Sequence, residues 1–213
     1  MNILIVIFLY TSVLIISEFA IRVFNTSKLT SRKISHVLGS LVSFSLPLLV
    51  SYQIAVVLGS LFFVVILYSK KKSLFKSIHD KKNQSYGEIF FPLGLILAGL
   101  FIWPVSVPAY QGACLILGLS DGLAGYLGYE WGRHKYNTFG GWKTYEGTII
   151  FFASTLTILL AYCHAYSSFD SVFKIVSIVV AAFILTTAEG LLSRGFDNLL
   201  LPVLSGLLLI ALL

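Results

Sequence analysis

Eight runs of apolar residues follow one another along the chain, separated by short polar connections. A helix that crosses a bilayer needs about 20 apolar residues, and the runs are of this length or somewhat shorter. Hydrophobic residues make up 57% of the 213 residues and charged residues only 11%, whereas soluble domains are about 25% charged. The sequence therefore predicts an all-α, polytopic bundle of about seven or eight membrane helices, forming one domain over residues 1–213.

Prolines and polar clusters divide the apolar runs. The run over 37–67 is too long for one crossing, and Pro47 with the polar segment 51–53 splits it into two spans. The other spans are expected over 3–23, 89–103, 109–119, 148–163, 172–188 and 199–213. The first run lacks the basic start of a signal peptide, so it should remain as a span. Cys114 and Cys163 lie inside apolar runs, where no redox or zinc role is expected.

Basic residues alternate between the predicted loops. Fourteen of the fifteen Lys and Arg residues fall in alternate connections, and the remaining one is Lys174. Because cytoplasmic loops carry the excess of basic residues, both termini are expected outside the cell and the basic loops inside. The net charge of +6 is then an orientation signal, and nucleic acid is not expected as a partner.

Other charged residues gather on the same predicted cytoplasmic side. The acidic residues are Glu88, Asp121, Glu146, Glu189 and Asp197, and basic residues near helix starts are Arg32, Lys33 and Lys143. Helix N-termini and cations bind phosphate, and carboxylates bind Mg²⁺. The pattern favours a site for Mg²⁺ and a polyphosphate at one membrane face, although charges also simply mark helix ends. A transporter would place polar groups near the membrane midplane.

Small residues form a stripe within the segment 120–132. In a helix, Asp121, Ala124, Gly125, Gly128 and Gly132 lie on one face. Such a stripe lets a ligand approach the backbone, or lets another helix pack closely. The spacing alone leaves both interpretations open.

The same segment carries a specific motif. The run Asp121-x-x-Ala124-x-x-x-Gly128-x-x-x-Gly132, followed by Lys143-Thr144-x-Glu146-Gly147-Thr148, resembles the CTP-binding segment of the polyprenol kinases, which include dolichol, phytol and farnesol kinases. Further matches are Arg32, Lys33, His36, 86–88, 91–94, Glu189, Asp197, Asn198 and Pro202. Trp142 stands where the family usually has another lysine. The chain length resembles that of the short, phytol-kinase-like members.

The resemblance implies that the γ-phosphoryl group of CTP is transferred to an isoprenoid-type alcohol such as phytol, farnesol, geranylgeraniol or a polyprenol, at the cytoplasmic face of the cell membrane. It implies that Lys143, Arg32 and Lys33 hold phosphates, and that Asp121, Glu146 and Asp197 hold Mg²⁺ or accept the alcohol proton. The other residues implied in binding are His36, Glu88, Ala124, Gly128, Gly132, Thr144, Gly147, Glu189 and Asn198. His36 is either a base or a hydrogen-bonding residue.

Other functions remain open at this point. A phosphatidate cytidylyltransferase or a CTP-dependent diacylglycerol kinase would use the same nucleotide, but the basic-acidic signature of the former is not visible near the C-terminus. A CDP-alcohol phosphotransferase would need a second aspartate pair after Asp121, which the sequence lacks. The alternative without enzymatic activity is a small membrane transporter.

Overall fold

The computed structural model describes residues 2–24, 26–72, 86–167 and 171–213, so Lys76, Lys81, Lys82 and Asp170 of the predicted loops lie outside the described residues. The helices are α1 (Asn2–Phe24), α2 (Lys28–Ser45), α3 (Tyr52–Lys72), α4 (Gly87–Phe101), α5 (Val107–Leu115), α6 (Asp121–Trp131), α7 (Tyr145–Tyr166), α8 (Val172–Leu191) and α9 (Phe196–Leu212). A 3-10 turn, η1 (Leu46–Leu48), follows α2. A π-helical turn, η2 (Ile116–Ser120), joins α5 to α6. The fold is all-α, as predicted, with one added hairpin of β1 (Lys135–Thr138) and β2 (Gly141–Thr144).

The outer surface of the bundle is apolar. Among the described residues, α1, α3, α7 and α8 are long and apolar enough to cross a membrane, and α4 and α9 are shorter apolar helices. Large side chains such as Leu4 and Phe173 are 72% and 79% exposed. Water would solvate such a surface poorly, whereas lipid tails would solvate it well. The protein is a polytopic helical membrane protein, and its span count stays a prediction.

Local sequence signals explain where the helices begin and end. Ser27, Ser106, Thr144 and Ser171 each precede a helix, and each side-chain oxygen accepts a hydrogen bond from the backbone N–H three residues later. Pro47 lies in η1, which confirms the predicted division of the 37–67 run. Helix α2 begins well before that run, because hydrophobicity marks only the apolar part of a helix while its cap lies in the polar segment.

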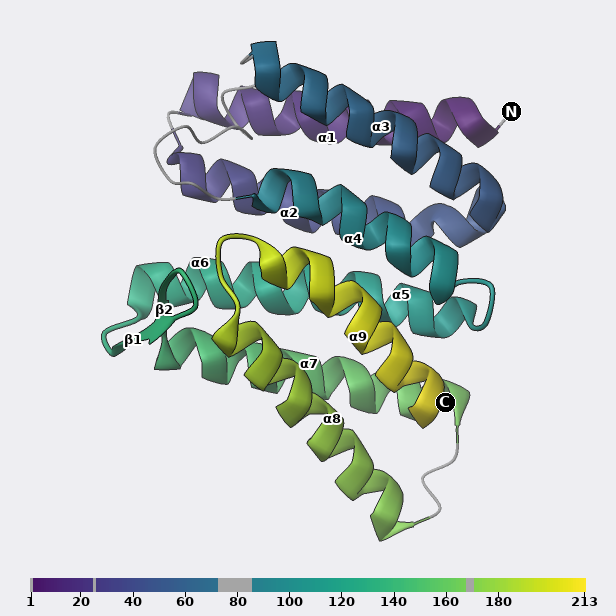
Figure 1. Cartoon of the computed structure of the whole chain (residues 1–213), viewed down its shortest axis with the longest axis vertical. Helices are drawn as coiled ribbons and strands as arrows, with labels where there is room; N and C mark the ends of the chain where they lie inside the picture. Colours follow the sequence, from purple (N-terminus) through teal and green to yellow (C-terminus); the bar gives the residue numbers. More distant parts are fainter. Residues whose placement is uncertain (1, 25, 73–85, 168–170) are drawn as a thin grey trace.

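The helices alternate in direction and bring one set of ends together. Helices α2, α4, α7 and α9 begin, and α1, α3, α6 and α8 end, at the end of the bundle that carries the hairpin (Figure 1). The charged residues predicted on one side therefore lie at one end of the described bundle. Which side of the membrane this end faces stays a prediction.

The core lies where α9 packs against α4, α5 and α8 (Figure 1). Small residues allow close helix contacts here. A Cβ atom added to Gly94 on α4 would lie 2.2 Å from the carbonyl oxygen of Asn198 on α9. Cys114 and Cys163 are buried free thiols in this core. The tight packing fixes the charged ends of α4, α8 and α9 relative to one another.

Candidate functional site

The β-hairpin brings Lys143 to the centre of the charged end. Strands β1 and β2 pair antiparallel, with Lys135 opposite Thr144. Successive residues of a strand point to opposite faces. Trp142 is accordingly exposed at the surface, while the side chain of Lys143 is only 16% exposed.

Hydrogen bonds fasten the tip of the hairpin to the connection between α8 and α9. The backbone N–H of Phe139 donates to the carbonyl of Leu191 over 3.1 Å, and the Ser193 hydroxyl donates to the carbonyl of Phe139 over 2.8 Å. Arg194 Nε donates to the Gly140 carbonyl over 2.9 Å. The hairpin and this connection therefore form one structural unit.

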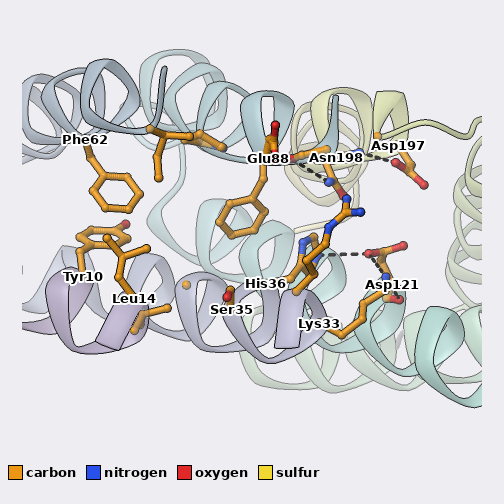
Figure 2. Close-up of a pocket in the computed structure, with 18 of the residues that line it drawn as sticks. Tyr10, Leu14, Lys33, Ser35, His36, Phe62, Glu88, Asp121, Asp197 and Asn198 are labelled. Carbon is orange, nitrogen blue, oxygen red and sulfur yellow. Dashed lines mark hydrogen bonds and ion pairs between the residues drawn. The ribbon is translucent and has the colours of Figure 1, made fainter. Parts of the chain in front are cut away.

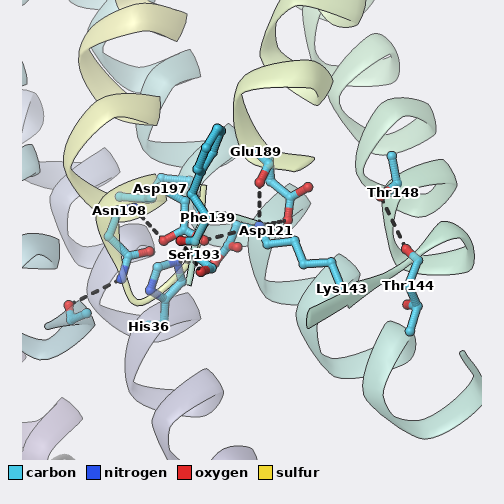
Figure 3. Close-up of polar contacts among 12 residues, drawn as sticks. His36, Asp121, Phe139, Lys143, Thr144, Thr148, Glu189, Ser193, Asp197 and Asn198 are labelled. Carbon is cyan, nitrogen blue, oxygen red and sulfur yellow. Dashed lines mark hydrogen bonds and ion pairs between the residues drawn. The ribbon is translucent and has the colours of Figure 1, made fainter. Parts of the chain in front are cut away.

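Lys143 pairs with two carboxylates that flank the same connection (Figure 3). Its Nζ lies 2.5 Å from Oε1 of Glu189 and 3.3 Å from Oδ2 of Asp197. Burial lowers the pKa of Lys143, but the carboxylates of Asp197 and Glu189 outweigh burial and hold this pKa above its ordinary value of 10.5. Lys143 therefore stays a charged donor that is suited to bind phosphate oxygens.

Asp121 is held by two residues of α2. Its Oδ2 atom lies 2.9 Å from Lys33 Nζ and 3.1 Å from His36 Nε2. The same histidine nitrogen lies 2.8 Å from the carbonyl oxygen of Leu117 in η2. Both neighbours of this nitrogen accept hydrogen bonds, so Nε2 carries a hydrogen and donates. Of the two roles considered for His36, the hydrogen-bonding role fits this geometry.

Three buried carboxylates converge at this point. Asp121, Glu189 and Asp197 each offer one oxygen, and these oxygens lie within 4.8 Å of one another. The second oxygen of Glu189, Oε2, is buried and has no hydrogen-bond partner in the described structure. Magnesium prefers oxygen ligands, carboxylates among them. The donor set and the unpartnered oxygen therefore fit a divalent cation.

The predicted metal set of Asp121, Glu146 and Asp197 needs one correction, because the structure does not bring Glu146 to this cluster. Glu146 lies in the first turn of α7, where its Oε1 accepts hydrogen bonds from the backbone N–H groups of Arg133 and His134 over 3.1 and 3.3 Å. The side chain thus fixes the base of the hairpin. Glu189, rather than Glu146, lies beside Asp121 and Asp197.

Substitution of these two glutamates should separate their roles. We expect Glu189→Gln to lower turnover by at least about 100-fold, because it removes charge from the carboxylate cluster. Glu146→Gln should retain most of the turnover, since its neighbours lie at the hairpin base. The measurement is the turnover rate of each folded variant in detergent. Equal losses in both variants would contradict the corrected metal set.

The stripe of small residues on α6 packs closely against neighbouring segments and also lines a cavity beside the β-hairpin. A Cβ atom added to Gly128 would lie 2.8 Å from Thr144 Oγ1 and 3.0 Å from Gly147 Cα, and one added to Gly125 would meet the end of the flexible Lys33 side chain. The Thr144 hydroxyl donates to the Gly128 carbonyl over 3.2 Å. At Gly128 the stripe thus packs against the start of α7, and the same glycine lines the adjoining cavity.

The remaining residues of the motif support the same packing. Gly132 ends α6 as its C-cap, and a Cβ atom there would lie 2.5 Å from Thr144 Cγ2. Ala124 is buried, and its carbonyl oxygen would lie 2.9 Å from a Cβ atom on Gly147. These small residues let α6 and α7 meet closely enough to place Asp121 near Lys143.

Gly128→Ala should therefore destabilise the protein even without nucleotide. Overpacking a tight contact costs about 1–3 kcal/mol, which exceeds the gain of roughly 1 kcal/mol from replacing a helical glycine. The measurement is the melting temperature of the ligand-free protein in detergent, with Leu123→Ala on the exposed face of α6 as the control. An unchanged melting temperature for Gly128→Ala would contradict the packing role.

Two cavities meet at the charged cluster. The hairpin cavity, of about 430 Å³, is lined by residues of α6, β2 and α7 that include Gly128, Lys143 and Thr144. The α1–α4 cavity, of about 220 Å³, lies among the first four helices (Figure 2). Both cavities are lined by Leu29, Lys33, Asp121 and Asp197.

The α1–α4 cavity has one polar end and one apolar end. Arg32, Glu88 and Asn198 line the polar end together with the shared charged residues. Glu88 also pairs with Lys70 over 2.7 Å, which ties α4 to the end of α3. Asn198 Nδ2 donates to the carbonyl of Gly87 over 3.2 Å. These predicted binding residues therefore face the α1–α4 cavity, away from Lys143.

Sequence reasoning missed the hairpin and the apolar part of the α1–α4 cavity. The pair Gly140-Gly141 between two short polar segments was a signal for a tight turn, and Gly140 has a φ of 102°. The apolar lining gave no signal, because cavity-lining and lipid-facing side chains have the same composition in a membrane helix.

The comparisons with known proteins find a relative that aligns with most of the chain. The chain is 29% identical over 184 residues to the phytol kinase of Synechocystis sp., an alignment that covers 84% of this chain and 77% of that protein. No family model matches the chain, and no solved structure matches it. The similarity extends over most of both chains, so this chain resembles that phytol kinase along most of its length.

Proposed function

We propose that this protein is a CTP-dependent kinase of isoprenoid-type alcohols, with its site at the cytoplasmic membrane face. One observation carries the proposal: two cavities of different character meet at Lys33, Asp121 and Asp197. Phosphoryl transfer needs a donor and an acceptor held in line, with charge neutralised between them. The similarity to phytol kinase supports a lipid alcohol kinase, and the two cavities supply separate places for two substrates.

The hairpin cavity suits the nucleotide. It is the larger of the two, and Lys143 with Lys33 supplies ammonium groups at its inner end. The N-terminus of α7, capped by Thr144, faces the same space and favours anions. Lys71 lies in the last turn of α3 and Arg194 follows α8, both at this end of the bundle, which supports a cytoplasmic orientation and access for CTP.

The α1–α4 cavity suits a lipid alcohol. Its polar end lies beside Asp121 and Asp197, while α1 and α3 line the other end with apolar side chains. A long-chain alcohol would place its hydroxyl at the carboxylates and its chain in the apolar part. One of the two shared carboxylates, Asp121 or Asp197, would then accept the proton of the hydroxyl.

Asp121, Glu189 and Asp197 would hold the Mg²⁺ that accompanies the nucleotide. When bound there, the ion would neutralise developing charge on the transferred phosphoryl group. Lys143 and Lys33 lie within reach of the same carboxylates and so bind phosphate oxygens beside them.

The test is a transfer assay with purified protein and CTP labelled in its γ-phosphate. We expect label on phytol, farnesol or geranylgeraniol, little transfer to diacylglycerol, and poor transfer from ATP. Phosphoryl transfer from ATP with little transfer from CTP would contradict the proposal that CTP is the donor. Release of pyrophosphate with formation of a CDP-lipid from phosphatidic acid would show a cytidylyltransferase instead.

A further inference from the structure

The α1–α4 cavity extends away from the charged cluster as an apolar arm. The arm is lined by Tyr10 and Leu14 of α1 and by Phe62 and Ile66 of α3. Figure 2 shows Tyr10 and Phe62 at the opposite end of the cavity from Asp121. The cavity thus matches a long-chain alcohol in polarity. The hydroxyl would lie at the carboxylates, and the end of the hydrocarbon chain would lie at the two rings.

Tyr10 and Phe62 form a pair across the end of this arm. Their ring centroids lie 5.1 Å apart with an interplanar angle of 31°. The hydroxyl of Tyr10 lies 2.8 Å from Oγ of Ser43 on α2, which is buried. This hydrogen bond and the ring contact hold α1, α2 and α3 together at the point where the arm stops.

A second, smaller cavity is also lined by this aromatic pair. Its volume is about 30 Å³, and its lining includes Ala55 and Gly59 of α3. The two cavities have Tyr10, Phe62, Phe91 and Pro92 in common. The aromatic pair therefore separates an arm that is open to the reaction centre from space that already exists beyond it.

We propose that Tyr10 and Phe62 set the longest alcohol chain that the site accepts. This inference rests on the proposed function and adds a residue-level account of acceptor length. Protein interiors are close-packed, so a chain that reaches the two rings cannot pass them without displacing one. Removing either ring would join the arm to the cavity lined by Ala55 and Gly59 and admit a longer chain.

The decisive experiment compares Phe62→Ala with Phe63→Ala, a matched control on the same helix whose side chain lines neither of the two cavities. The readouts are phosphorylation and binding, the latter as thermal stabilisation of the protein, for a series of isoprenoid alcohols of increasing length. Each additional buried methylene strengthens binding, so we expect the preference of Phe62→Ala for an alcohol one isoprene unit longer to rise by about tenfold or more. Phe63→Ala should keep the length profile of the wild-type protein.

Tyr10→Ala and Tyr10→Phe repeat the test on the opposite helix. Tyr10→Ala should shift the preference toward longer alcohols, as Phe62→Ala does. Tyr10→Phe should keep the wild-type preference, because its ring remains. An unchanged profile in folded Phe62→Ala and Tyr10→Ala would overturn the inference while leaving the kinase activity established. If no alcohol is phosphorylated but the binding profile still lengthens in both alanine variants, the proposed function fails and the chain-length role stands.

Discussion

Replacing Lys143 with alanine should lower the turnover rate by about 100- to 1000-fold, the loss expected when one fixed charge that stabilises a transition state is removed. Lys143 is the buried cation that the hairpin brings to Glu189 and Asp197. Its removal takes away the proposed phosphate contact and leaves these carboxylates with less compensating charge. The measurement is turnover with saturating CTP and alcohol.

The matched control for Lys143→Ala is Arg133→Ala, which removes an exposed cation from the same connection. Arg133→Ala should retain turnover close to that of the wild-type protein. Melting temperatures in detergent identify variants that fail to fold, and Lys143→Arg then tests the site with the charge kept. A folded Lys143→Ala protein with normal turnover would contradict the phosphate-binding role.

Asp121→Asn should cause a loss of similar size, because Asp121 lines both cavities and belongs to the carboxylate cluster. Asparagine keeps the shape and one acceptor oxygen, so helix packing changes little. The lost negative charge weakens the contacts with Lys33 and His36 and removes a candidate proton acceptor. Turnover and Mg²⁺ dependence are the quantities to measure.

The control for Asp121→Asn is Asn137→Ala, a polar change on β1 that lies outside both cavities. Asn137→Ala should leave the Mg²⁺ dependence unchanged. Retention of wild-type turnover by Asp121→Asn would show that the reaction centre lies elsewhere.

The sequence was sufficient to predict the helical order because each membrane helix carries its own signal. Pro47 lies in the 3-10 turn that follows the end of α2, and the Ser27 hydroxyl caps the start of that helix. Lys143, Asp121 and Asp197 were predicted together by the family motif, and the structure brings them to one cluster. Their positions in the sequence alone do not show that they lie close together. They do so because the helices alternate in direction, which brings one end of each helix to the same end of the bundle.

The errors came from features that depend on how neighbouring elements pack. Glu146 was assigned to the metal from its place in the family motif, yet the start of α7 turns its carboxylate to the backbone of Arg133 and His134. Glu189 is distant in sequence and reaches the cluster only because α8 packs beside α7. For Gly128 the spacing left packing and ligand approach open, and the structure shows that it packs against α7 and also lines the hairpin cavity.

The position of α9 between α4, α5 and α8 has a consequence for biosynthesis. The chain is made from its N-terminus, and the cluster needs Asp121 from α6, Glu189 from α8 and Asp197 from α9. Until α9 inserts, the membrane holds a partly assembled bundle whose buried acids lack their final neighbours and whose α4 surface around Gly94 lacks its partner. Assembly of the carboxylate cluster and completion of the helical core therefore take place in the same late insertion step.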